Sequence, residues 1–159
     1  MDLDTTEILW TLDLLRDKQL PTLACEMLLA GLNNEPLRRL AGLSDYELSE
    51  SKPLFSAVLE QLGRTGLGKK EAVLRLVRIV SLQIVSGEVD AYDGAKKTWN
   101  AQRNSGFSIS DFCHKIDPFI YVADEYEERP ADREFFKQAI IRVASRWLED
   151  TADGTDREE

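Results

Sequence analysis

The stretch over residues 69–99 reads KKEAVLRLVRIVSLQIVSGEVDAYDGAKKTW and decides the fold class. In its first part, apolar residues surround most of a helical circumference and leave only a thin polar stripe, which is typical of a buried helix. Its β-branched residues would also suit a strand, but about eighteen residues without an internal glycine or proline are too many for one strand. Gly87 stands where a glycine commonly ends a helix. We therefore predict a buried central helix over residues 69–86.

The rest of the chain repeats the signals that start and stop helices. Asp, Asn and Ser residues stand at capping positions, and prolines stand in first turns. The clearest amphipathic helix covers about residues 131–148. A pattern from Ser110 onward is interrupted at Asp117-Pro118, which indicates either a kink or a new helix start. Other helices are expected to begin near Asp4, Pro21, Asn34, Pro53 and Asp90.

The length and composition suit one compact core. With 159 residues, of which 43% are hydrophobic, the chain requires no disulfide or metal to fold. We predict one all-α domain over residues 1–148, an irregular array of about six to eight helices, because the helices are too uneven in length for a regular bundle. Residues 149–159 carry six acids and one base. This acidic tail is expected to be disordered, or helical only over its first residues.

Charge and motifs narrow the classes of function. The net charge is −9, and the few lysines and arginines form no aromatic-interleaved patch, so we expect no nucleic-acid partner. Met1 is not followed by the basic stretch and then apolar stretch of a secretory signal, so we expect none. No apolar run approaches the length of a membrane span. Cys25 and Cys113 lie in helical patterns and are expected to be reduced thiols buried as small hydrophobes. These features predict a cytoplasmic protein.

Nucleophilic and zinc chemistry are not favoured. His114 is the only histidine and directly follows Cys113. Adjacent residues on a helix diverge by about 100°, so the two side chains do not form a chelating pair. Neither a zinc set nor a Cys-His nucleophile can be assembled, and we expect a surface or interfacial histidine.

Paired carboxylates are the main candidates for metal chemistry. Acids three residues apart share a helix face, so two such pairs on facing helices could hold Mg²⁺ or Mn²⁺ against a phosphate. The arrangement resembles that of all-helical nucleotide pyrophosphohydrolases, which implies a divalent-metal-dependent hydrolase of a phosphorylated substrate. Unlike that family, the first pair is Asp-x-x-Asp at a helix cap, and capping or solvation alone would explain these acids. The alternative ligands are Asp90, Asp93, Asp124, Glu127 and Glu128.

Tyrosines beside these acids favour recognition of another protein. Tyr121 and Tyr126 flank Asp124, and tyrosine in an acidic setting suits a basic partner. Our leading hypothesis is therefore a non-catalytic protein-interaction module without a cofactor, immunity-like or regulatory in role. The expected binding surface consists of Glu88, Asp90, Asp93, Tyr121, Asp124, Tyr126 and Glu127.

A resemblance covers the second half of the chain. The run SGEVDAYDGAKKTW, followed later by DPFIYVADEYEERPADRE, resembles a pattern in small uncharacterised bacterial all-helical proteins. The shared features are Gly-Glu, a short acidic turn, Gly-Ala and then Trp, with an aromatic-acidic stretch before an Arg-Pro helix start. The resemblance implies a helical bacterial protein and attaches no activity to it.

Overall fold

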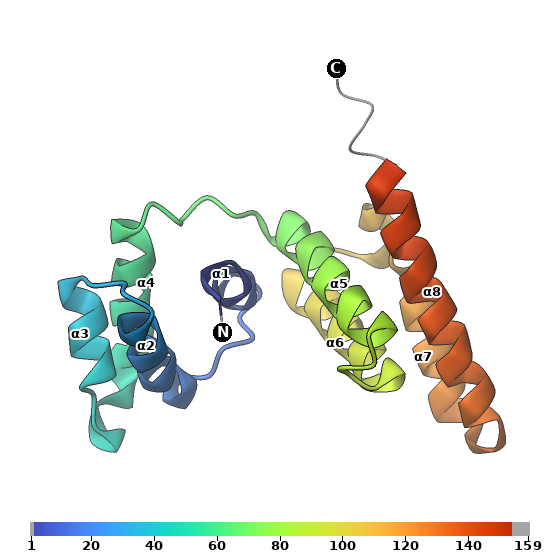
Figure 1. Ribbon diagram of the computed structural model, residues 1–159, viewed down its shortest axis with the longest axis horizontal. Coiled ribbons are helices and arrows are strands. Elements are labelled where there is room, and N and C mark those ends of the chain that lie inside the picture. The colour runs from blue at the N-terminus through green and yellow to red at the C-terminus, as the bar shows by residue number, and fades with distance from the viewer. Residues whose placement is uncertain (1, 154–159) are drawn as a thin grey trace. The chain divides into compact units, whose positions relative to one another are not determined.

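The structure, a computed structural model, describes residues 2–153 and is all-helical, as predicted (Figure 1). Over these residues it contains eight α-helices, four short 3₁₀ helices and no strand. Contacts divide the chain into a first unit, Met1–Lys69, and a second unit, Lys70–Glu159, which are described separately. The prediction of a single domain over residues 1–148 stays a prediction. The elements are α1 (Leu3–Thr11), η1 (Asp17–Gln19), α2 (Leu20–Leu29), α3 (Glu35–Ala41), η2 (Asp45–Glu50), α4 (Ser51–Gln61), α5 (Lys69–Val85), α6 (Ala91–Ser105), η3 (Ile109–Phe112), α7 (Asp117–Glu128), η4 (Pro130–Asp132) and α8 (Arg133–Asp153).

The core of the first unit lies where α2, α3 and α4 pack together. Asn34 caps α3 by accepting a hydrogen bond from the Leu37 backbone nitrogen at 2.9 Å, and Pro36 occupies the first turn, where its missing N–H is not needed. The largest fully buried side chains of this core are Leu20, Leu37, Leu40, Phe55 and Val58.

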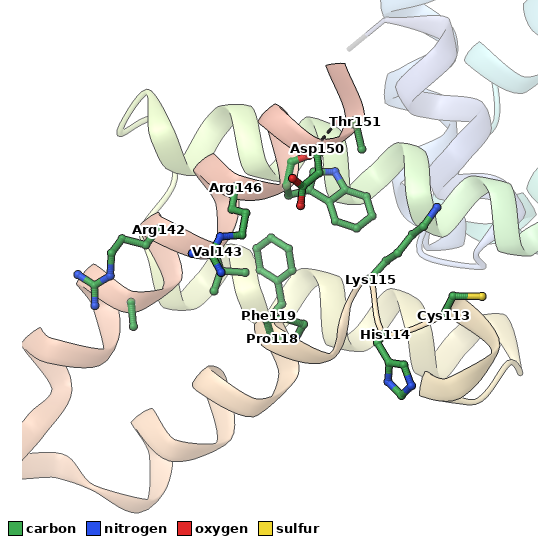
Figure 2. Close-up of a pocket in the computed structure, with 12 residues that line it drawn as sticks. Cys113, His114, Lys115, Pro118, Phe119, Arg142, Val143, Arg146, Asp150 and Thr151 are labelled. Atoms are coloured by element: carbon green, nitrogen blue, oxygen red, sulfur yellow. Dashed lines mark hydrogen bonds between the residues drawn. The ribbon is translucent and has the colours of Figure 1, made fainter. Parts of the chain in front are cut away.

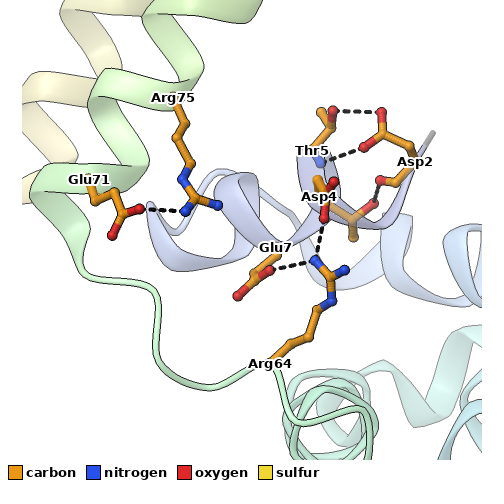
Figure 3. Close-up of polar contacts among 8 residues, drawn as sticks. Asp2, Asp4, Thr5, Glu7, Arg64, Glu71 and Arg75 are labelled. Carbon is orange, nitrogen blue, oxygen red and sulfur yellow. Dashed lines mark hydrogen bonds and ion pairs between the residues drawn. The ribbon is translucent and has the colours of Figure 1, made fainter. Parts of the chain in front are cut away.

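The start of α1 differs from the prediction. Asp2, rather than Asp4, caps the helix, because its carboxylate accepts from the Thr5 backbone nitrogen at 2.8 Å. The helix ends at Thr11, and Asp13 follows with a positive φ of 53°. Figure 3 shows the capping carboxylate and Thr5.

An arginine ties the segment after α4 to α1. Arg64 donates to the carboxylates of Asp4 and Glu7, with 2.9 Å between Arg64 Nη1 and Glu7 Oε2 (Figure 3). Glu7 is only 8% exposed. A buried carboxylate needs a cation or several donors, so Arg64 allows this acid to lie inside the first unit.

The predicted central helix forms as α5, but it is buried along one face only. Ala72, Val73, Leu76, Val80 and Ile84 are buried. On the opposite side, Leu82 and Val85 are 52% and 47% exposed. The sequence pattern predicted burial around most of the helix, and this was wrong. Exposed apolar residues are common in proteins, so an apolar residue need not be buried.

Helix α6 packs closely against α5 at a glycine. A Cβ atom at Gly94 would lie 2.6 Å from both Cγ1 and Cδ1 of Ile84 and 3.1 Å from Cγ1 of Val80. A glycine inside a helix lowers stability by about 1 kcal/mol relative to alanine, so its presence here follows from the close approach of α5. Helices α6, α7 and α8 then pack against one another, and Figure 1 shows α7 and α8 side by side.

The interruption at Asp117-Pro118 is a new helix start, not a kink. Cys113 and His114 both have positive φ, 51° and 60°, so the chain leaves η3 through two left-handed residues. Helix α7 then begins at Asp117, with Pro118 in its first turn. The buried side chains of Phe112 and Ile116 anchor this link on either side.

Helix α8 extends through Asp153, so the first residues of the acidic tail are helical, which was one of the two predicted alternatives. Residues 154–159 lie outside the described residues. Of the helices that the structure describes, none has the length and apolar character that crossing a membrane requires.

Candidate functional site

The residues of the predicted acidic surface lie on neighbouring helices. Asp90 and Asp93 stand at the start of α6, and Glu88 lies just before it. Helix α7 packs against α6 and carries the remaining predicted residues (Figure 1). The side chains on α7 are Tyr121, Asp124, Tyr126, Glu127 and Glu128.

Two residues that the sequence analysis missed join α6 to α7. The ring of Tyr92 stacks on that of Tyr126, with 4.2 Å between centroids. The Tyr92 hydroxyl donates to Glu127 at 2.5 Å, and the Lys96 ammonium donates to the same carboxylate oxygen at 2.6 Å. Tyr92 and Lys96 stand four residues apart on one face of α6, and this spacing was the signal that could have revealed them.

Two cations of α8 complete the cluster from the other side. Lys137 donates to Asp90 at 2.5 Å, while Asp90 also accepts from the backbone nitrogens of Tyr92 and Asp93 as the cap of α6. The guanidinium of Arg133 lies 5.1 Å from the centroid of the Tyr126 ring. Asp90 and Glu127 are therefore each neutralised within the chain, and both hold their helices together.

The hydrogen bonds shift three pKa values. Lys96 first and Tyr92 second hold the pKa of Glu127 below its ordinary value of 4.5. Lys137 and backbone donors likewise lower the pKa of Asp90. The bond to the negative Glu127 favours the neutral phenol and raises the pKa of Tyr92 from 10.0 to about 12.

The first prediction concerns this phenol. Replacing Glu127 with glutamine is expected to return the pKa of Tyr92 toward 10, because a neutral amide no longer repels the phenolate. Because the folded pKa is the higher one, the stabilising contribution of the Tyr92 bond is present below pH 10 and is lost as pH rises toward about 12. The measurement is a titration of phenolate absorbance in the near ultraviolet.

Glu128→Gln is the matched control for this titration, because none of the contacts that the structure describes joins Glu128 to a tyrosine. Its tyrosine titration should coincide with that of the unsubstituted protein. An unchanged titration in Glu127→Gln would contradict the bond between Tyr92 and Glu127.

The other predicted acids remain without cations. Within residues 2–153, no lysine or arginine lies within ion-pair distance of Asp93, Asp124 or Glu128, and Tyr121 is 66% exposed. Tyr121, Asp124 and Glu128 are spaced by three and four residues along α7, which places them along one helix face. We call these three residues the α7 stripe.

A separate cavity of about 530 Å³ lies in the second unit, between the segment that leads into α7 and the C-terminal half of α8 (Figure 2). Its apolar lining includes Pro118, Phe119, Ala139, Val143 and Trp147. A cavity of this volume is in the range that holds a small organic molecule.

Basic side chains contribute to the lining of this cavity. Lys115, Arg142 and Arg146 line it, together with a single acid, Asp150 (Figure 2). Sequence reasoning missed this set because Lys115 lies far along the chain from the two arginines, and only the fold brings them to one cavity. The spacing of four residues between Arg142 and Arg146 was a partial signal.

Comparison with known proteins identifies no relative. No family model, no curated protein and no solved structure matches the chain. The resemblance to small bacterial helical proteins therefore stays a prediction, and the function of the chain rests on its own geometry.

The metal-dependent alternative also stays a prediction. Asp90 faces Lys137, and Glu127 faces Lys96 and Tyr92, so these two carboxylates already have partners. In the part of the chain that the structure describes, no three His, Cys, Asp or Glu side chains are grouped as metal ligands.

The predicted burial of the cysteines is wrong. Both Cys25 and Cys113 are exposed. Cys113 ends η3 in a left-handed conformation instead of continuing a helix, so the helical pattern does not carry it into the core. His114 is exposed, as expected, and its Nδ1 lies 2.6 Å from Asp117 Oδ2.

Proposed function

We propose that the chain is a non-catalytic protein-interaction module that binds a basic partner through the acidic surface on α6 and α7. This surface consists of Glu88, Asp90, Asp93, Tyr121, Asp124, Tyr126 and Glu127, and we include Glu128 because it shares a face of α7 with Tyr121 and Asp124. The observation that supports the proposal best is the placement of acids at the C-terminal end of α7.

Helix α7 has four carboxylates in its last five residues and no lysine or arginine. The C-terminal end of a helix carries partial negative charge, so each carboxylate there lowers stability by about 0.3–1 kcal/mol. Lys96 compensates Glu127, and Arg129 compensates Glu125 at 2.9 Å. No described ion pair offsets the repulsion between the negative end of α7 and the carboxylates of Asp124 and Glu128. Helix stability therefore does not explain these two acids.

A basic partner would explain these acids and the exposed aromatic residue beside them. Cations of the partner would meet Asp124 and Glu128, and the Tyr121 ring would supply rigid apolar contact at the same face. Tyrosine is enriched at protein interfaces, and charge complementarity mainly speeds association and selects the partner. An immunity-like or regulatory protein that neutralises a basic partner requires a surface of this kind.

The test reverses the two acids that have no internal partner. Asp124→Lys/Glu128→Lys should weaken partner binding at least about tenfold while leaving the free energy of unfolding unchanged or raising it by about 0.3–1 kcal/mol per site. Glu127 is left unchanged, because its replacement would break the contacts to Lys96 and Tyr92. The measurements are thermal melting and quantitative capture of partners from an extract of the native cells.

Glu60→Lys is the matched control. Glu60 is exposed in the last turn of α4, so its reversal changes the charge at a helix C-terminus outside the proposed surface. A specific partner should be retained by Glu60→Lys and lost by the double variant. Equal capture by both variants would rule out the α7 stripe as the binding face.

A further inference from the structure

The cavity beside α8 has an apolar floor and a cationic rim. Phe119 and Val143 lie across it from the segment over residues 113–115, and Trp147 completes the apolar lining. Figure 2 shows Arg146 near Val143 and Phe119, with Arg142 and Lys115 on opposite sides, and Asp150 is the only acid among the lining residues. The charge of the lining is therefore positive, although the chain as a whole is strongly acidic.

The cations of this lining have no ion pairs within the part of the chain that the structure describes. Among the residues that the structure describes, no carboxylate lies within ion-pair distance of Lys115, Arg142 or Arg146. Arg142 and Arg146 are four residues apart on α8, so two like charges face each other on one helix, which opposes helix stability. In a chain with 29 acids and 20 bases, three cations that line one cavity without ion pairs among the described residues favour an anion from outside.

The indole of Trp147 lies in the same lining. This residue is only 8% exposed, and its Nε1–H is buried with no acceptor among the described residues. A buried donor without an acceptor is unfavourable, so a change beside the cavity should be felt at this N–H group.

A smaller neighbouring cavity extends the basic region. It has a volume of about 220 Å³ and shares Lys115, Trp147 and Thr151 with the larger one. Arg78 of α5 also lines it and has no ion pair within residues 2–153. Glu71 and Arg75 also line it as an ion pair, so Arg78 and Lys115 give this lining its net positive charge.

We propose that this cavity binds a small amphipathic organic anion, with its acidic head at Arg142 and Arg146 on α8 and its apolar body against Phe119, Val143 and Trp147. Guanidinium groups bind carboxylates and phosphates in a forked geometry, which favours an oxyanion head. The apolar floor requires more than an inorganic ion. This site does not include the acidic surface on α6 and α7, so its test is separate from that of the proposed function.

The experiment uses the full chain and three probes of known chemistry. Anilinonaphthalene sulfonate, an aromatic anion that fluoresces in apolar sites, should bind with saturation at one site per chain. Decanoate, an apolar chain with an acidic head, should displace it. Decanol, which has no charge, should displace it at least about tenfold more weakly, because it lacks the charge-assisted hydrogen bonds. Inorganic phosphate, which has no apolar body, should also compete weakly.

Arg142→Gln/Arg146→Gln removes the two exposed arginines and should lower the affinity for decanoate at least about tenfold. Lys97→Gln/Arg103→Gln on α6 is the matched control, because it removes the same charge from exposed positions outside the cavity. The control should bind within about twofold of the unsubstituted protein. An equal loss of decanoate affinity in both double variants would mean that net charge alone causes the effect, and it would overturn the proposed site.

An NMR spectrum of the indole N–H groups gives a readout at one atom. The chain has three tryptophans, and Trp147→Phe identifies the signal of Trp147. Decanoate should shift that signal and leave those of Trp10 and Trp99 in place. Displacement by decanol as strong as by decanoate, or an unmoved Trp147 signal at saturation, would overturn the proposal.

Discussion

Gly94→Val is expected to lower the free energy of unfolding by about 3 kcal/mol, the upper part of the range for overpacked cores. The Cβ atom of the new residue would lie 2.6 Å from two carbons of Ile84, closer than packed carbons approach. Gly94→Ala should be milder, about 1 kcal/mol, because alanine regains helix propensity while meeting the same side chain. Chemical denaturation of each variant measures the loss.

Two variants test the cause of this loss. Ile84→Val shortens the side chain that meets position 94, so Gly94→Ala should be less destabilising in the Ile84→Val background than alone. Gly66→Ala is the control, because a Cβ atom at Gly66 would have no neighbour within 4 Å. A Gly94→Ala protein more stable than the unsubstituted one would show that α5 and α6 separate easily.

Arg64→Met should lower the free energy of unfolding by about 2 kcal/mol, less than for a fully buried pair because Arg64 is partly exposed. Methionine keeps much of the apolar length of the side chain but leaves Glu7 without its cation. Glu7 is 8% exposed, so its charge would stay in a poorly solvated place. Chemical denaturation is again the measurement.

The double variant Glu7→Gln/Arg64→Met separates charge from packing. If the loss comes from an unpaired buried carboxylate, the neutral glutamine should restore about half of it or more. Arg103→Met is the control, because Arg103 is exposed and has no ion pair among the described contacts. A loss in Arg64→Met no larger than in Arg103→Met would contradict a structural role for the bridge.

The sequence predicted the class of the fold because helix signals are local. Asn34 and Asp90 cap helices as their residue types indicated. Local patterns did not predict which apolar residues face solvent or where the backbone becomes left-handed. The apolar Leu82 and Val85 of α5 face outward, and the helical pattern around Cys113 gives way to left-handed residues.

The two candidate sites show the same limit. The acids on α6 and α7 were visible because carboxylates at regular spacing stand out in a sequence. Their internal cations, Lys96 and Lys137, were not, since pairing across helices depends on packing. The cavity was missed for the same reason, because Lys115 and Arg146 line one cavity only when α7 and α8 pack together.

The exposed thiols have a practical consequence. Cys25 lies on α2 in the first unit, and Cys113 lies in the second. One dye at each position would report the melting of its own unit. Coincident curves would mean that the units unfold as one cooperative system, and separate curves would mean that each is a thermodynamic domain. The same dyes would assign the damage from Arg64→Met and Gly94→Val to the unit in which it begins.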